Sequence, residues 1–144
     1  MNDRYQLSRF EQAQAPVYEQ VLAELREGHK RSHWMWFIFP QLAGLGHSAM
    51  AQRFAIASLD EAKAYLAHPV VGARLRECAR LVLAVPDRSI HYIFGSPDDL
   101  KFRSCMTLFS RAAPAEPVFQ QCLQKYFAGH GDPQSITLLR GHGP

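Results

Sequence analysis

The sequence contains no apolar stretch long enough to cross a membrane. Its longest uninterrupted apolar run is the six residues from Trp34 to Phe39, whereas a membrane-spanning helix needs roughly 18 or more. The first residues, MNDRYQLSRFEQ, also lack the apolar core of a secretory signal peptide. We therefore expect a cytoplasmic protein without a membrane partner.

Cysteines are few and show no metal-binding pattern. The chain has three, Cys78, Cys105 and Cys122, with no CxxC pair and no Cys/His spacing typical of a zinc site. All three stand among apolar residues, which predicts buried, reduced thiols. The sequence also lacks a phosphate-binding P-loop, a nucleophile elbow and a Ser-His-Asp order. It therefore indicates no metal site and no cofactor.

Charge of one sign is not in large excess. Sixteen Lys and Arg against thirteen Asp and Glu give a net charge of +3, and nucleic-acid-binding domains usually carry a denser basic stripe. The densest basic group is His29, Lys30 and Arg31, followed by His33. We interpret this group as a solvated loop and do not expect a nucleic-acid partner.

Helical periodicity, by contrast, is abundant. Pro16 marks the start of one predicted helix and Gly28 marks its end. Its apolar face comprises Tyr18, Val21, Leu22 and Leu25, and the opposite face, which we predict to be exposed, comprises Glu19, Gln20, Glu24 and Glu27. Ser58 and Glu61 form a capping box before a second helix, and a third runs from Pro69 to about Val85.

Two more helices are predicted after Pro117 and Pro133, each with proline in the first turn and glycine beyond the end. Period-two alternation is nearly absent, and SIHYIF (89–94) is the one strand-like piece, which cannot form a sheet alone. We therefore predict an all-α protein. It should form one compact multihelical domain of about six to eight helices within residues 1–144, with its core at about 7–139.

The helix predicted from Pro97 to Arg111, with Ser96 as N-cap, should be central because it is apolar over most of its circumference. Its polar residues Asp98, Lys101, Ser104 and Thr107 nevertheless lie off the solvent stripe. Burying an unpaired charge costs several kcal/mol. One interpretation is an internal Asp98–Lys101 pair with both hydroxyls bonded to the helix backbone. The other is a cleft in which Lys101, Ser104 and Thr107 face an anionic or polyhydroxyl ligand.

The aromatic segment HWMWFIFPQ (33–41) also allows two interpretations. Trp34 and Trp36 either pack in the core or form an apolar wall that stacks a base or a sugar. His33 could act as an acid or a base at the edge of such a site. Arg74 lies at the edge of the apolar stripe of its helix, where it could hold a carboxylate or phosphate, or form an ion pair with Glu77 or Asp98.

Several strings of residues resemble a known family. HKRSHWMWFIFPQLAGLGHS, EAKAYLAHPVVGARL, IFGSPDDLKFRSCMTLF and the closing FQQCLQKYFAGHGDPQSITLL look like the bacterial family catalogued as domain of unknown function 1810. The likeness covers roughly Leu7 to Leu139 and implies a multihelical single domain with no assigned activity. Ser135 stands where the family pattern leads us to expect threonine. A more distant likeness, in size, helical architecture, aromatic N-terminal segment and a helical lysine near phenylalanine, is to the NAD- and ADP-ribose-associated (NADAR) family of small helical N-glycosidases.

Two functional hypotheses follow. In the first, the domain binds a small nucleotide-like or ADP-ribose-like anion in a pocket and, if it is an enzyme, hydrolyses an N-glycosidic bond with Asp98 as the acid or base. The ligand-binding residues would be His33, Trp34, Trp36, Arg74, Lys101, Ser104 and Thr107. In the second, the domain is a non-catalytic binding or protein-interaction module in which these residues are structural. Both stay open at this point, as does the number of subunits.

Overall fold

The computed structural model describes residues 3–141, which form a single compact domain of ten helices. In chain order these are α1 (Ser8–Gln14), α2 (Tyr18–Glu27), α3 (Met35–Ile38), α4 (Ala49–Arg53), α5 (Leu59–Ala67), α6 (Val71–Ala84), α7 (Ile90–Phe94), α8 (Asp98–Ala112), α9 (Pro117–Phe127) and α10 (Pro133–Gly141). The predicted all-α class is confirmed, but the predicted six to eight helices were too few. The reason is length, because α3, α4 and α7 have only four or five residues and show no apolar period in the sequence.

Two local predictions were wrong. The strand-like SIHYIF forms α7, in which the Ser89 hydroxyl accepts a hydrogen bond from the backbone N–H of Tyr92 at 3.0 Å as an N-cap. The helix after it, α8, begins at Asp98 with Pro97 at the N-cap position, so Ser96 does not cap it. The capping box at α5 is present in part: Glu61 N–H donates to the Ser58 hydroxyl at 3.1 Å, but the Glu61 carboxylate accepts from Ala57 N–H.

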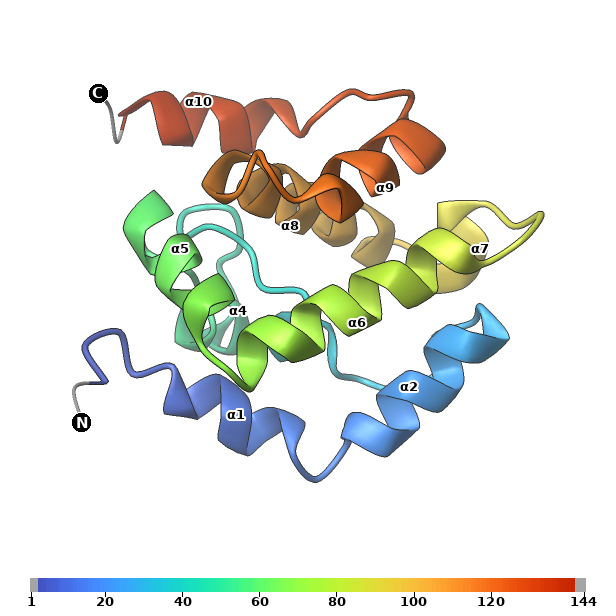
Figure 1. The fold of residues 1–144 in the computed structure, drawn as a ribbon, viewed down its shortest axis with the longest axis horizontal. Helices are drawn as coiled ribbons and strands as arrows, with labels where there is room; N and C mark the ends of the chain where they lie inside the picture. Colours follow the sequence, from blue (N-terminus) through green and yellow to red (C-terminus); the bar gives the residue numbers. More distant parts are fainter. Residues whose placement is uncertain (1–2, 142–144) are drawn as a thin grey trace.

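The helices surround α8 (Figure 1). This helix packs against α5, α7, α9 and α10, and eight of its fifteen residues are buried. Helix α6 crosses the molecule and contacts α2, α5 and α9, with α1 and α2 along the lower edge of the view. The predicted central position of α8 is confirmed, although Leu100 in its first turn stays 56% exposed. That first turn therefore meets the surface, as does Arg111 in the last turn.

Aromatic rings fill the core beside the start of α8. Phe39, the last aromatic residue of the segment 33–41, packs edge-on against Phe102 of α8 at a centroid distance of 5.0 Å. Phe94 of α7 stacks on Phe102, also at a centroid distance of 5.0 Å. Edge-to-face and offset contacts of this kind add to the stabilisation from burial. The segment 34–39 is therefore a structural link between α7 and α8.

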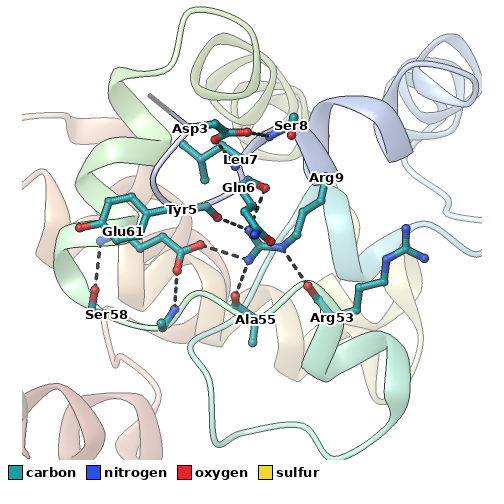
Figure 2. A network of polar contacts seen from close by, with 11 residues as sticks. Asp3, Tyr5, Gln6, Leu7, Ser8, Arg9, Arg53, Ala55, Ser58 and Glu61 are labelled. Carbon is teal, nitrogen blue, oxygen red and sulfur yellow. Dashed lines mark hydrogen bonds and ion pairs between the residues drawn. The ribbon is translucent and has the colours of Figure 1, made fainter. Parts of the chain in front are cut away.

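Arg9 joins three segments at the opposite end of the domain (Figure 2). Its guanidinium donates to the carbonyls of Arg53 (2.9 Å) and Ala55 (2.8 Å) and to the buried Glu61 carboxylate (3.1 Å). It therefore ties α1 to the end of α4 and the start of α5. Each of these acceptors is bonded to Arg9 within the domain, so we interpret the network as structural.

The predicted burial of the cysteines agrees with the structure. Cys78, Cys105 and Cys122 are buried and free, and burial raises the pKa of the Cys78 and Cys122 thiols to about 12. None of the described helices has the length and the apolar character that crossing a membrane requires.

The tight α5–α6 connection gives a prediction with a definite sign. Alanine normally stabilises a helix relative to glycine by about 1 kcal/mol, but a Cβ on Gly72 would lie 2.4 Å from the backbone oxygen of Leu66. We expect Gly72→Ala to destabilise the domain by roughly 1–3 kcal/mol, measured by urea unfolding. The matched control is Gly141→Ala, where no described atom lies within 4 Å of the new Cβ. An equal effect of the two changes would contradict the observed packing.

Candidate functional site

Glu24 of α2 is fully buried, although the helical pattern places it on the exposed face. Helix α2 is followed by Gly28, whose backbone is left-handed (φ 70°). The chain after Gly28 covers the Glu24 side chain. From there His29 N–H donates to the carbonyl of Glu24 at 3.0 Å, and the following loop folds back over this side of the helix. The prediction of an exposed face was wrong here because the covering segment is not part of the helix.

The carboxylate of Glu24 accepts five hydrogen bonds. Three come from the backbone N–H groups of Arg31 (2.8 Å) and Ser32 (3.0 Å) and from the indole N–H of Trp34 (3.0 Å). The other two come from the Ser32 hydroxyl and from the Gln20 amide at 2.8 Å. Burial alone would raise the pKa of this carboxyl, but the donors of Ser32, Arg31 and Gln20 outweigh it and lower the pKa to about 2. Glu24 is thus a buried anion that fixes the loop.

Lys30 lies in this loop and is not solvated, which corrects the interpretation of the basic group for this residue, whereas Arg31 and His33 are exposed as expected. Its ammonium is 2.9 Å from Asp98 Oδ2, and the two side chains are only 8% and 19% exposed. Its backbone N–H also donates to the carbonyl of Ile93 at 2.7 Å. On the other side of Asp98, Lys101 Nζ lies 3.7 Å from Oδ1, which is the predicted i, i+3 pair. One carboxylate therefore faces two cations.

The two tryptophans have different places. Trp34 is 1% exposed and belongs to the core, with the Lys30 ammonium 5.1 Å from its ring centroid. Trp36 is half-buried, with the Lys101 ammonium 5.5 Å from its ring centroid. Both distances fall in the range of cation–π contacts. We call Lys30, Trp34, Trp36, Asp98 and Lys101 the lysine–tryptophan cluster.

The hydroxyls of Ser104 and Thr107 are bonded within α8. Ser104 donates to the carbonyl of Leu100 at 3.1 Å, and Thr107 donates to that of Arg103 at 2.8 Å. Thr107 also accepts from Asp132 N–H at 2.8 Å, which secures the segment leading into α10. These are the backbone bonds that the structural interpretation expects.

Arg74 and His33 are not bonded to the lysine–tryptophan cluster. Arg74 donates to Gln14 at 3.3 Å and covers the ring of Tyr18 at 4.9 Å, and it forms neither of the predicted ion pairs with Glu77 and Asp98. His33 is exposed and has no polar partner within residues 3–141. The structure thus brings together four of the eight predicted site residues: Trp34, Trp36, Asp98 and Lys101.

The cluster forms a partly exposed patch. Among the hollows of the described surface are five that no cluster residue lines. One of about 370 Å³ lies between Gly44 and α10, and another of about 520 Å³ lies beside α7. These five hollows therefore do not include the predicted pocket. The described residues also contain no group of His, Cys, Asp and Glu arranged for a metal ion.

Glu24 yields a stability prediction. We expect Glu24→Gln to lower the free energy of unfolding by roughly 2–4 kcal/mol, because a neutral amide accepts fewer and weaker hydrogen bonds in this buried network. The folded-state pKa of about 2 lies below the ordinary 4.5. The stability that Glu24 contributes is therefore complete above pH 4.5 and is lost as the pH falls toward 2.

Urea unfolding between pH 2 and pH 7 measures both effects. Wild type should lose stability more steeply than the Glu24→Gln variant as the pH falls from 4.5 to 2, which are the ordinary and folded-state pKa values of this carboxyl. Parallel curves for the two proteins would show that Glu24 does not titrate as a bonded, buried acid.

Comparisons with known proteins agree with the fold. The sequence matches the family described as "Protein of unknown function (DUF1810)" over residues 4–139. The structure is similar to the crystal structure of a conserved hypothetical protein from Mycobacterium tuberculosis, with 55% identity and a TM-score of 0.95 over 96% of this chain and 99% of that one. The comparison with curated proteins gives no match, and none of these findings concerns the NADAR family. Because the match spans nearly the whole chain, the protein belongs to the family of unknown function 1810.

Proposed function

We propose that the exposed side of the lysine–tryptophan cluster binds a small anionic, nucleotide-like ligand. The observation that carries the proposal is that the two lysines lie at unequal distances from the Asp98 carboxylate. Lys30 holds Oδ2 at 2.9 Å, whereas Lys101 stands 3.7 Å from Oδ1, which is longer than a hydrogen bond. With 26% of its side chain exposed, Lys101 keeps donors for a ligand, and Oδ1 keeps lone pairs.

The chemistry of these groups indicates the class of ligand. The two ammonium groups and one carboxylate carry a net charge of +1, which favours an anion such as phosphate. The half-buried ring of Trp36 beside Lys101 offers a face on which a base can stack. Asp98 Oδ1 can accept hydrogen bonds from sugar hydroxyls. An ADP-ribose-like molecule combines phosphate, base and sugar.

Hydrolysis of an N-glycosidic bond is the reaction we propose for such a ligand. Asp98 is the only carboxylate of the cluster and would take a proton from the attacking water. The water oxygen would bond to the anomeric carbon while the carbon–nitrogen bond breaks and its electron pair leaves with the base. From NAD the base leaves as neutral nicotinamide, and the proton taken by Asp98 passes to solvent. The second candidate is a non-catalytic binding or interaction module. It is favoured by the backbone bonds of Ser104 and Thr107, in which each hydroxyl already donates its proton to a helix carbonyl.

Binding of ADP-ribose, measured by isothermal titration calorimetry at low salt, tests the proposal. We expect Lys101→Met and Trp36→Leu each to weaken binding by about tenfold or more, because one removes the cation and the other the stacking face. Neither change should cost more than about 1 kcal/mol of stability, because both side chains are partly exposed. Release of free base from NAD in the same samples tests hydrolysis, with Asp98→Asn as the inactive variant.

The matched control is Lys63→Met, which removes a lysine charge from the exposed face of α5. It should bind ADP-ribose like wild type if binding is local, and like Lys101→Met if only net charge matters. Absence of binding by wild type to ADP-ribose, NAD and AMP at millimolar concentration would contradict the proposal and favour the interaction module.

A further inference from the structure

We propose that Glu24 is a positioning residue for the candidate site: it places Lys30, and through Lys30 it sets the position of the Asp98 carboxylate. The effect on a ligand rests on the proposed function, but the effect on Asp98 does not. Glu24 is fully buried and cannot touch a ligand itself. Its influence must therefore pass through the loop.

The first step is the fixing of the loop on both sides of Lys30. On one side, Glu24 accepts from the backbone N–H groups of Arg31 and Ser32, at 2.8 and 3.0 Å. On the other, the carbonyl of Glu24 accepts from His29 N–H at 3.0 Å. Lys30 thus sits between residues that are bonded to the same glutamate. With φ and ψ held at its neighbours, the direction in which its side chain leaves the backbone is restricted.

The second step is the support of the Lys30 side chain by Trp34. The indole N–H of Trp34 donates to Glu24 at 3.0 Å, and the face of the same ring lies 5.1 Å from the Lys30 ammonium. Glu24 therefore orients the surface over which this ammonium rests. A ring turned away from Glu24 would leave Lys30 without this contact.

The third step is the contact between Lys30 and Asp98. The 2.9 Å distance to Oδ2 is that of a charge-assisted hydrogen bond, and only 8% of the Lys30 side chain is exposed. Asp98 stands in the first turn of α8, where Lys101 approaches its other oxygen at 3.7 Å. Since Lys30 makes the shorter contact, it decides which oxygen stays available on the Lys101 side. A shift of Lys30 would move Asp98 toward Lys101.

The test compares Glu24→Gln with Glu61→Gln. Glu61 is a second buried, hydrogen-bonded glutamate, but it bonds to Arg9 and Ala57 at the other end of the domain. The readouts are the ¹³C resonance of the Asp98 carboxyl, the ¹⁵N resonance of the Lys30 ammonium, and the affinity for ADP-ribose. All are measured under conditions in which each variant is folded by circular dichroism.

We expect Glu24→Gln to shift both resonances and to weaken ADP-ribose binding by about fivefold or more, while Glu61→Gln leaves resonances and affinity as in wild type. Ser32→Ala, which removes one donor and keeps Glu24, should shift the resonances in the same direction and serves if Glu24→Gln fails to fold. Unchanged Lys30 and Asp98 resonances in these variants would overturn the proposal. The resonances report positioning even if wild type binds no ADP-ribose, so this outcome is separate from failure of the proposed function.

Discussion

The buried carboxylate of Glu24 is the constraint on which the candidate site depends. An ion taken out of water must be paired or fully hydrogen-bonded, or the fold loses several kcal/mol. Within residues 3–141 no cation forms an ion pair with Glu24, and the chain satisfies the carboxylate with five donors, four of them from residues 31–34. The loop after α2 must therefore turn back over the helix. That turn brings Lys30 to α8 and Trp34 into the core.

Asp98 connects the buried loop to the surface of the candidate site. One of its oxygens completes a nearly buried ion pair with Lys30, and the other faces Lys101 at the surface. The aromatic segment divides in the same way, because Trp34 and Phe39 pack among core rings while Trp36 stays half-exposed beside Lys101. Most of the segment therefore fills the core. The part that stays partly exposed is the Trp36 ring, next to the Lys101 ammonium.

The sequence predicts the parts of this structure that depend on a single helix. The apolar stripe of α6 and the central place of α8 are correct because both follow from spacing alone. Asp98 and Lys101 were singled out because they lie off a solvent stripe. Glu24 and Lys30 were not predicted as site residues, because the groups around them come from segments that only folding brings together. A glutamate on the polar face of a helical pattern gives no sign that a loop will cover it.

The titration of the Glu24 carboxyl, followed by its ¹³C resonance, tests the central claim most directly. A buried carboxylate that accepts five hydrogen bonds should titrate with a midpoint near its pKa of about 2 and should report a single folded environment above it. A midpoint near 4.5, the ordinary value of a glutamate, would mean that the carboxyl is solvated. In that case Glu24 would not hold the loop, and the positions of Lys30 and Asp98 would need another cause.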